Sequence, residues 1–335
     1  MEETRVGIIG TGWMAEAHRG VLDGLEGVAI VAVADLDLGK GEAFASRCGA
    51  RAYGDWRQLL DEEDLDAVFV CVPPLAHKEP ALAAFARGLP TYLEKPIARD
   101  LDDAALVVQA AEAAGCVCAV GYQWHALPLL SDLRGLLAGQ AIGLLVGTSI
   151  GPTASRPWFL DRRAGGGNLL ERGSHHLDLL RSVGGEIASV QAAASRVLLA
   201  RGAGDPGAVG GGDIDDAVSI LAELRSGALA SVTVAWTRED QPGRYTLDVV
   251  AAEATLRLDL DPDFRLSGTS SGNPVSIESP SLPLEASVTA FLRAAKAGDP
   301  ALVCCTPKDA RATLEVAVAA ERALATGRAV DVAIV

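Results

Sequence analysis

The first third of the chain alternates short, almost wholly apolar runs with segments of helical length. The apolar runs cover residues 5–10, 28–35, 66–73, 90–96 and 116–122. The segments predicted to be helical lie between them, at 13–24, 39–48, 76–87 and 101–114. Strands that are apolar throughout and separated by helices are typical of a parallel sheet covered on both faces.

The pattern changes near residue 123, where the strands become longer and apolar residues alternate with polar ones. After a predicted helix at 126–138, such strands cover 144–150, 189–199, 215–224, 228–236, 245–252 and 254–260. Alternation, with short turns between strands, indicates a mostly antiparallel sheet. Two further helices are expected at 285–297 and 307–326.

The predicted fold is therefore α/β with two domains, a division that also suits a chain of 335 residues. The first domain would span 1–122 and bind a dinucleotide. The second would span 123–335 as an α+β domain with a large, mostly antiparallel open sheet. Its final helix could pack back on the first domain.

Charge and apolar length exclude several classes of partner. The chain carries 29 Lys and Arg against 44 Asp and Glu, a net charge of −15, which disfavours a phosphate backbone or an anionic membrane surface as partner. No segment approaches the ~20 apolar residues of a membrane helix, and residues 1–10 lack the charge and apolar stretch of a secretion signal. The six cysteines form no C-x-x-C pair, so we expect a cytoplasmic protein with buried thiols.

A glycine-rich turn joins the first apolar run to the first helix. Gly10, Gly12 and Ala15 form a G-x-G-x-x-A pattern, which permits a tight turn and a close approach of pyrophosphate to the helix N-terminus. Asp35 ends the second run, 20 residues after Ala15, where its carboxylate can accept the ribose hydroxyls of an adenosine. Its charge would repel a 2′-phosphate, which favours NAD over NADP. Lys40 is close enough in sequence to keep NADP open.

Two candidate groups lie where the third and fourth runs end, at the edge where parallel sheets bind ligands. The third run ends at Pro73 and is followed by His77, which either caps the next helix or touches the cofactor. The fourth ends in Glu94-Lys95-Pro96. A lysine beside a bound nicotinamide can hold a substrate oxygen and help move its proton, and the proline restrains the backbone that carries it.

A further candidate group lies in residues 162–185, which are predicted to form a glycine loop followed by a helix. In a regular helix Glu171, His175 and Asp178 share one face. This arrangement suggests an acid–base group centred on His175. A metal site made of the same three residues is the alternative, although zinc needs three or four ligands and no further His/Cys cluster is apparent.

The neighbours of this group also carry predictions. A regular helix turns His176 away from His175, toward packing or the edge of a substrate. The three glycines at 165–167 predict a flexible loop. Gly173, which is costly inside a helix, would let the cofactor or the other domain pack closely.

Several of these motifs together resemble the glucose–fructose oxidoreductase, inositol dehydrogenase and rhizopine-catabolism (Gfo/Idh/MocA) family. The matching stretches are Gly10-Thr11-Gly12, Pro73 with His77, EKP at 94–96, GYQ at 121–123 and GGGNLLERGSHHLD at 165–178. EKP alone is common, but its place 22 residues after Pro73, followed by the later glycine and histidine stretch, is specific. The resemblance covers essentially the whole chain.

This resemblance implies a Rossmann domain followed by a larger, open antiparallel-sheet domain. It implies an enzyme that uses NAD(P) to oxidise a sugar, inositol or related secondary alcohol, or to reduce the ketone. Lys95 would be the catalytic lysine, with a cis peptide bond to Pro96, and His175 the acid–base histidine. Glu171 takes the place of an aspartate that assists this pair in inositol dehydrogenases. Relatives commonly assemble through their sheets, so we expect a homodimer or homotetramer.

The expected binding residues lie at the glycine turn, at the strand ends and in the second domain. For the cofactor they are Gly10, Thr11, Gly12, Trp13, Met14, Asp35, Pro73, His77, Glu94 and Lys95. For the substrate they are Gln123, His125, Trp158, Arg162 and His176. His125 stands where many members of the family carry arginine, which bears on substrate choice. Trp158 and Trp236 either line the pocket or belong to the core, and His18 is expected to be structural.

The predicted reaction transfers a hydride between C4 of nicotinamide and a carbinol carbon. In the oxidation direction His175 would take the hydroxyl proton, and Lys95 would bind the oxygen and stabilise its developing charge. Two alternatives remain open. One is a glycosidase that uses bound NAD for a transient oxidation, and the other is a non-catalytic regulator that binds nucleotide and sugar.

Overall fold

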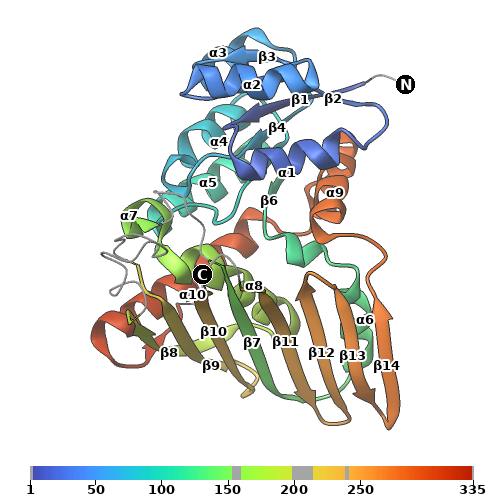
Figure 1. Ribbon diagram of the computed structural model, residues 1–335, viewed down its shortest axis with the longest axis vertical. Coiled ribbons are helices and arrows are strands. Elements are labelled where there is room, and N and C mark those ends of the chain that lie inside the picture. The colour runs from blue at the N-terminus through green and yellow to red at the C-terminus, as the bar shows by residue number, and fades with distance from the viewer. Residues whose placement is uncertain (1–2, 153–159, 198–213, 238–240, 334–335) are drawn as a thin grey trace. The chain divides into compact units, whose positions relative to one another are not determined.

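The protein is described here by a computed structural model that covers residues 3–152, 160–197, 214–237 and 241–333. The chain forms two compact units, each built from two separate stretches (Figure 1). The N-terminal unit contains residues 1–126 and 283–311, and the sheet unit contains residues 127–282 and 312–335. Within the described ranges, no helix is long and apolar enough to cross a membrane.

A six-stranded parallel sheet forms the centre of the N-terminal unit. Its strands are β1 (Thr4–Ile9), β2 (Val28–Ala34), β3 (Arg51–Tyr53), β4 (Ala67–Val70), β5 (Thr91–Leu93) and β6 (Cys118–Val120). The spatial order is β3-β2-β1-β4-β5-β6, and each of these neighbouring pairs is parallel. This is the strand order of the dinucleotide-binding Rossmann fold. Successive strands are added toward one edge of the sheet from β1 to β3 and toward the other edge from β4 to β6. The predicted α/β architecture is confirmed.

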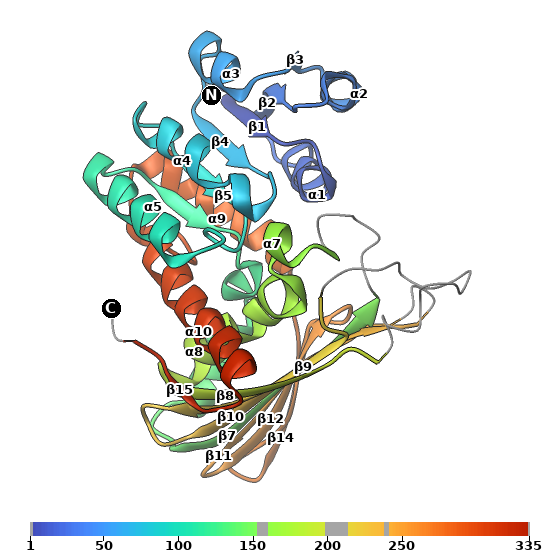
Figure 2. The same cartoon turned by 90° about the vertical axis from the view of Figure 1, so that its left-hand side faces the viewer.

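The helices of this unit flank its sheet (Figure 2). They are α1 (Trp13–Leu22), α2 (Leu38–Cys48), α3 (Trp56–Glu62), α4 (Lys78–Phe85), α5 (Leu101–Ala114) and α9 (Pro283–Ala297). Helix α1 packs against α9, whereas α4 packs against α3 and α5. The sequence did not predict β3 or α3, because a three-residue edge strand and a seven-residue helix are too short to show a clear periodicity.

The N-terminal unit also contains α9, whereas the sequence predicted one domain boundary, at residue 122. The ring of Phe291 in α9 packs edge-on against Phe69 of β4 and Tyr92 of β5, with centroid distances of 5.4 and 5.5 Å. The Tyr92 hydroxyl also hydrogen-bonds to Ser287 of α9 at 2.9 Å. Burial of these rings favours the packing of α9 on this sheet. Because α9 lies far from β4 and β5 in sequence, no local pattern predicts this contact.

The sheet unit is built on a nine-stranded sheet with the order β14-β13-β12-β11-β7-β10-β9-β8-β15. Its strands are β7 (Ile142–Pro152), β8 (Ile187–Ser195), β9 (Ala217–Leu224), β10 (Leu229–Thr237), β11 (Arg244–Ala251), β12 (Ala254–Asp261), β13 (Arg265–Ser270), β14 (Asn273–Glu278) and β15 (Val330–Asp331). Of these described pairs, β7 with β10 is parallel and the others are antiparallel. The mostly antiparallel sheet is confirmed. Strands β13 and β14 were not predicted, since their Ser, Gly, Asn and Pro are typical of turns.

The two faces of this sheet differ. The helices of the unit are α6 (Leu129–Leu137), α7 (Arg162–Gly165), α8 (Ser174–Gly184) and the part of α10 (Pro307–Thr326) from residue 312 onward. Helix α8 packs against β7 and β10, on the face that buries Leu145 and Val232. On the other face Leu144 pairs in register with Leu229 and Val250, and all three are exposed.

Candidate active site

The turn between β1 and α1 has the geometry that a bound pyrophosphate needs. Gly10 has φ +88°, and a Cβ added there would lie 2.6 Å from the carbonyl oxygen of Cys71, so this position requires glycine. Gly12 is the N-cap of α1, with open space where a Cβ would be and no side chain capping the helix. Ala15 is fully buried, which lets helix and sheet approach closely. These features fit the phosphates of a dinucleotide.

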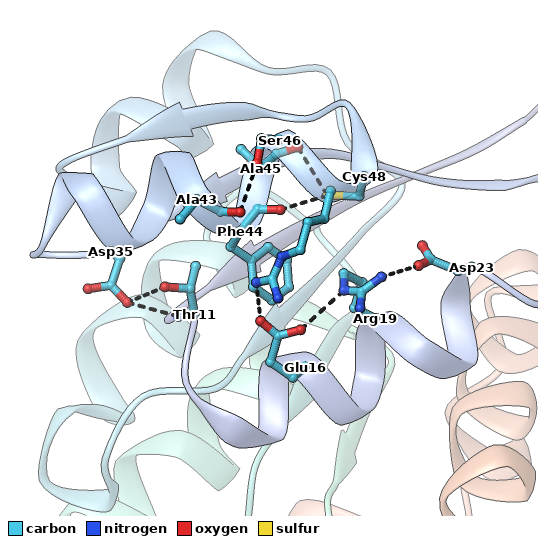
Figure 3. Close-up of polar contacts among 11 residues, drawn as sticks. Thr11, Glu16, Arg19, Asp23, Asp35, Ala43, Phe44, Ala45, Ser46 and Cys48 are labelled. Atoms are coloured by element: carbon cyan, nitrogen blue, oxygen red, sulfur yellow. Dashed lines mark hydrogen bonds and ion pairs between the residues drawn. The ribbon is translucent and has the colours of Figure 1, made fainter.

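Asp35 is held in place at the end of β2 by hydrogen bonds from its own surroundings (Figure 3). Its Oδ2 accepts from the backbone N and the Oγ1 of Thr11, at 2.9 and 2.7 Å, and its Oδ1 accepts from the backbone N of Asp37 at 2.9 Å. Burial works to raise the pKa of Asp35, but the hydrogen bonds from Thr11 and Asp37 outweigh it and lower that pKa. The carboxylate is therefore charged and oriented. Nζ of Lys40 lies 3.4 Å from Oδ2 of Asp37, so this lysine is paired with another carboxylate. The negative charge of Asp35 therefore disfavours a 2′-phosphate beside it.

Lys95 is presented from a segment that is otherwise buried. Strand β5 leads directly into Glu94-Lys95-Pro96, and the Lys95–Pro96 peptide bond is cis, as the family resemblance implies. Among residues 91–98, all of which the structure describes, Lys95 alone is partly exposed. The backbone thus brings one amino group to the surface at the carboxyl edge of the parallel sheet.

Glu94, which was predicted to bind the cofactor, is instead buried inside the N-terminal unit. Its Oε1 lies 2.7 Å from Nε2 of His18, and its Oε2 accepts a hydrogen bond from the backbone N of Lys95 at 3.2 Å. Both oxygens have partners within the protein, and the cofactor contact of Glu94 stays a prediction. His18 is fully buried, in agreement with the structural role expected of it.

His77 does not cap the next helix, which was one of the two roles predicted for it. It is fully buried, its side chain does not cap α4, and its ring contacts backbone oxygens on both sides. Nδ1 lies 2.8 Å from the carbonyl oxygen of Pro96, and Nε2 lies 2.9 Å from that of Val72. Burial lowers the pKa of His77, although the two carbonyl groups act to raise it. A neutral ring donates to one of these oxygens, and His77 packs between the two strand-end loops, while its cofactor contact stays a prediction.

The sheet unit presents a second group of side chains from a buried segment. Among residues 165–180, all described, Glu171, Arg172 and His175 are partly exposed and the others are buried. Residues Leu169–Gly173 form a π-helical turn (η4), which runs directly into α8. The prediction of a regular helix is therefore wrong over Leu169–Gly173, and the α-helical spacing that placed Glu171 on the face of His175 does not apply, whereas His175 and Asp178 both lie in α8. π-Helical turns occur frequently at functional sites.

Asp178 and His176 lie inside the sheet unit. Oδ1 of Asp178 accepts a hydrogen bond from Thr313 at 3.0 Å, which ties α8 to α10. Nε2 of His176 lies 3.1 Å from the carbonyl oxygen of Thr246, and its ring fills the space beside Gly147. Burial lowers the pKa of His176 to about 4. His176 is fully buried, which favours the packing alternative over the predicted contact with substrate.

The glycines around this segment pack closely, although a flexible loop was predicted. All three glycines at 165–167 are buried, and a Cβ on Gly167 would lie 3.1 Å from Ile214. A Cβ on Gly173 would lie 3.3 Å from Val234 of β10. The absence of a side chain at Gly173 therefore lets this segment pack closely on β10 of its own unit. Close packing of backbone on side chains does not fit the flexible loop that was predicted here.

The predicted substrate residues fall into different environments. Gln123 and His125 belong to the short helix η2 (Gln123–Ala126) of the N-terminal unit, and both are partly exposed. Arg162 begins α7 of the sheet unit, with its Nη2 2.6 Å from Oδ2 of Asp215. Trp158 lies outside the described residues. No signal in the sequence pointed to Asp215, because its partner lies 53 positions away.

Arg172 was also not identified from the sequence. Its guanidinium lies 4.2 Å from the ring centroid of Trp236 and donates to the carbonyl oxygen of Pro152 at 2.8 Å. Burial lowers the pKa of Arg172, although it stays far above neutrality as arginines do. Trp236 is buried against this cation, which supports the core alternative for that tryptophan.

Two family models match the chain. One, described as an oxidoreductase family with an NAD-binding Rossmann fold, matches residues 4–122. The other, the GFO/IDH/MocA C-terminal domain, matches residues 144–257. Together they cover more than half of the chain, and the two matched stretches are centred on the two sheets.

Curated relatives extend this match. Levoglucosan dehydrogenase of Pseudarthrobacter phenanthrenivorans is 27% identical over 288 residues, which cover 76% of this chain and 73% of the relative. Rhizopine catabolism protein MocA of Rhizobium meliloti is 28% identical over 330 residues, which cover 97% and 96%. Inositol 2-dehydrogenase 1 of Saccharopolyspora erythraea is 34% identical over 143 residues, which cover 42% of each chain.

Solved structures show the same fold over the full length. Levoglucosan dehydrogenase in complex with NADH and levoglucosan has a TM-score of 0.88 at 20% identity, with 100% of both chains covered. GenD2 from gentamicin A biosynthesis, in complex with NAD, has a TM-score of 0.83 at 24% identity, with 100% and 97% covered. With the family models and the geometry of the glycine turn, these likenesses lead to one conclusion: the chain belongs to the Gfo/Idh/MocA family and is an NAD-dependent oxidoreductase.

Proposed function

We propose that the chain oxidises a secondary alcohol of a sugar or related polyol with NAD⁺, or reduces the corresponding ketone, with Lys95 and His175 as its catalytic residues. One observation carries the assignment of these residues. Each unit holds a buried segment from which few polar side chains emerge: Lys95 in 91–98, and Glu171, Arg172 and His175 in 165–180. A few partly exposed ionisable groups in otherwise buried segments support a role in chemistry.

The chemistry follows from the proton that leaves the substrate. When bound, NAD⁺ supplies the hydride acceptor. His175 takes the hydroxyl proton, since a histidine titrates near neutral pH and can both accept and return it. The ammonium of Lys95 donates to the same oxygen and stabilises the negative charge that develops there. Glu171, in the turn before α8, orients the ring of His175.

Three groups hold the cofactor in this proposal. The uncapped N-terminus of α1, with Gly12, Trp13 and Met14, takes the pyrophosphate. The fixed carboxylate of Asp35 takes the adenosine ribose, while Thr11 orients that carboxylate through two hydrogen bonds. Pro73 is exposed at the end of β4, where it can face the nicotinamide half.

The substrate class is supported by what the relatives are named for. They include dehydrogenases of levoglucosan, of inositol and of glucose 6-phosphate. All of these are polyhydroxylated ring compounds, which a site recognises through hydrogen bonds to several hydroxyl groups. Gln123, His125 and Arg162 supply donors and acceptors of that kind and are partly exposed.

We also propose that the open face of the nine-stranded sheet joins two subunits, in a homodimer or homotetramer. Leu144, Leu229 and Val250 are neighbours there, with 38%, 49% and 40% of their surface exposed. Adjacent exposed apolar side chains on a sheet are typical of a contact surface.

A substrate panel tests the proposed reaction. Purified protein is given levoglucosan, myo-inositol, D-glucose or D-glucose 6-phosphate with NAD⁺ or NADP⁺, and formation of the reduced nucleotide is followed by its absorbance. We expect NADH from at least one neutral ring polyol, and weaker or no reaction with NADP⁺. Hydrolysis of a glycoside without net NADH would favour the glycosidase alternative, and nucleotide binding with no turnover of any ring polyol would favour the regulator.

A further inference from the structure

The backbone on both sides of Lys95 is held by a buried histidine. The two histidines come from different helices, His18 from α1 and His77 from the residue before α4, and both are fully buried. Neither is exposed to a bound substrate. They nevertheless reach the two residues that flank the Lys95 side chain, through Glu94 on one side and Pro96 on the other.

The contact before Lys95 runs through a carboxylate. Nε2 of His18 lies 2.7 Å from Oε1 of Glu94, and Oε2 of Glu94 accepts from the backbone N of Lys95 at 3.2 Å. The His18 ring is itself fixed by Phe69 and Tyr92, at centroid distances of 5.1 and 4.9 Å. Rotation of Glu94 would therefore break a buried hydrogen bond, which is costly where water cannot replace it.

A glycine makes room for this carboxylate. A Cβ on Gly121, in the turn after β6, would lie 3.0 Å from Oε2 of Glu94. The carboxylate thus fills the space that a side chain would occupy, and the backbone N of Gly121 donates to Leu93 at 2.8 Å. Glu94 is confined by α1 on one side and by the turn after β6 on the other.

The contact after Lys95 is direct. Nδ1 of His77 lies 2.8 Å from the carbonyl oxygen of Pro96, and Nε2 lies 2.9 Å from that of Val72. Val72 follows β4 and Pro96 follows β5, and these strands are neighbours in the parallel sheet. The ring therefore sets the separation of the two strand-end loops between which a nicotinamide would be seated.

We propose that His18 and His77 are positioning residues that fix the Lys95 backbone from both sides, so that its amino group meets the substrate oxygen in the productive geometry. The inference rests on the proposed catalytic role of Lys95. A displacement of a catalytic group by about 1 Å lowers the rate by about 100-fold. Loss of either histidine contact therefore lowers kcat, while NAD⁺ is still bound by the glycine turn and Asp35.

Amide substitutions separate the individual contacts. Asparagine places its nitrogen near the position of histidine Nδ1, and glutamine reaches the position of Nε2. In this proposal the ring proton of His77 lies on Nδ1, which then donates to Pro96, so H77N should keep kcat within about threefold, and H77Q should lose about 10- to 100-fold. At residue 18 the contact to Glu94 uses Nε2, so the order reverses: H18Q should be the more active and H18N the less active.

The experiment measures kcat, KM and the Kd for NAD⁺ of all four variants, with K78A as a control that alters the residue next to His77. Lys78 pairs with Asp103 on the surface at 2.7 Å, so K78A should match the wild type. Stoichiometric NAD⁺ binding shows that each variant is folded. We expect an unchanged Kd, a lowered kcat and a reversed order at the two sites. A merely structural role would lower the unfolding temperature without the reversal, and that result would overturn the inference.

A lysine variant distinguishes the two proposals. If Lys95→Ala is inactive while H77Q and H18N keep the full kcat, the positioning inference fails and the catalytic role of Lys95 stands. If Lys95→Ala keeps the full kcat, the catalytic role fails, and the positioning inference fails with it.

Discussion

Residues 91–98 and 165–180 both present ionisable side chains from a buried backbone, but different interactions hold the backbone in place. Each segment is buried and lets a few ionisable side chains emerge. Around Lys95 the backbone N of Lys95 donates to the Glu94 carboxylate, and the carbonyl oxygen of Pro96 contacts the ring of His77. Around His175 it is held by close packing, in which glycines press on the apolar side chains of neighbouring elements. The first segment should respond to the loss of a donor or acceptor, and the second to a change in volume.

The largest effect is expected from removing the acid–base group of the second segment. His175→Ala should lower kcat by about 100- to 10,000-fold, because the hydroxyl proton then has no positioned acceptor. The Kd for NAD⁺ should stay within about twofold, since the cofactor residues of this proposal lie in the other unit. Steady-state kinetics with the substrate found in the panel, together with NAD⁺ titration, measures both. A kcat within threefold of wild type would remove His175 from the mechanism.

A pH series separates His176 from its neighbour His175. Burial lowers the pKa of His176 to about 4 in the folded chain, against 6.5 for an ordinary histidine. Between these values the unfolded ring binds a proton and the folded ring does not, so stability is lost as the pH falls from 6.5 toward 4. The difference amounts to at most about 3 kcal/mol.

Urea unfolding of wild type and His176→Gln across this pH range measures the effect. Glutamine keeps a donor near the Nε2 position but has no ionisation in this range. We expect the wild type to lose more stability than the variant on acidification. Parallel pH dependences of the two proteins would show that His176 is not held neutral by burial.

Glycine substitutions test the packing of the second segment. Gly166 has φ +78°, and an added Cβ would overlap Leu170, so Gly166→Ala should lower the free energy of unfolding by about 1–3 kcal/mol. Gly135, in the exposed face of α6 with open space around it, is the matched control. Gly135→Ala should raise stability by up to about 1 kcal/mol. Equal effects at the two glycines would mean that the loop at 165–167 is not closely packed.

The smallest effect on catalysis is expected on the open face of the sheet. Leu229→Glu would place a charge in the proposed subunit contact and should weaken assembly by at least about 100-fold, with kcat per folded subunit nearly unchanged. Leu302→Glu, at a similarly exposed leucine of the N-terminal unit, is the control. Light scattering over a range of concentrations reports the mass of each protein. A wild type that stays monomeric at all concentrations would contradict the proposed assembly.

The sequence reveals local chemistry better than it reveals long-range packing. The G-x-G-x-x-A turn, Asp35 and the order of strands and helices follow from local patterns, and the structure agrees with them. The family resemblance supplied the cis bond at Pro96. The roles of Glu94 and His77 could not be read in advance, because their partners lie on other elements.

The second segment was harder to predict for another reason. Helical spacing assumes a constant number of residues per turn, and the π-helical turn at Leu169–Gly173 breaks that assumption. The glycines at 165–167 have the composition of a flexible loop, yet a Cβ on Gly166 would overlap Leu170 and one on Gly167 would lie 3.1 Å from Ile214. Composition alone does not separate a glycine that moves from a glycine that packs.

The most direct test of the account is rapid-mixing measurement of NADH formation by Lys95→Ala. The variant is first saturated with NAD⁺ and then mixed with the substrate found in the panel, beside wild type and the K78A control. We predict that Lys95→Ala binds NAD⁺ with unchanged affinity and forms NADH about 100- to 1,000-fold more slowly, because the developing negative charge on the substrate oxygen has lost its donor. NADH formation at the wild-type rate would contradict the central claim that this exposed amino group, presented by a buried segment, acts in hydride transfer.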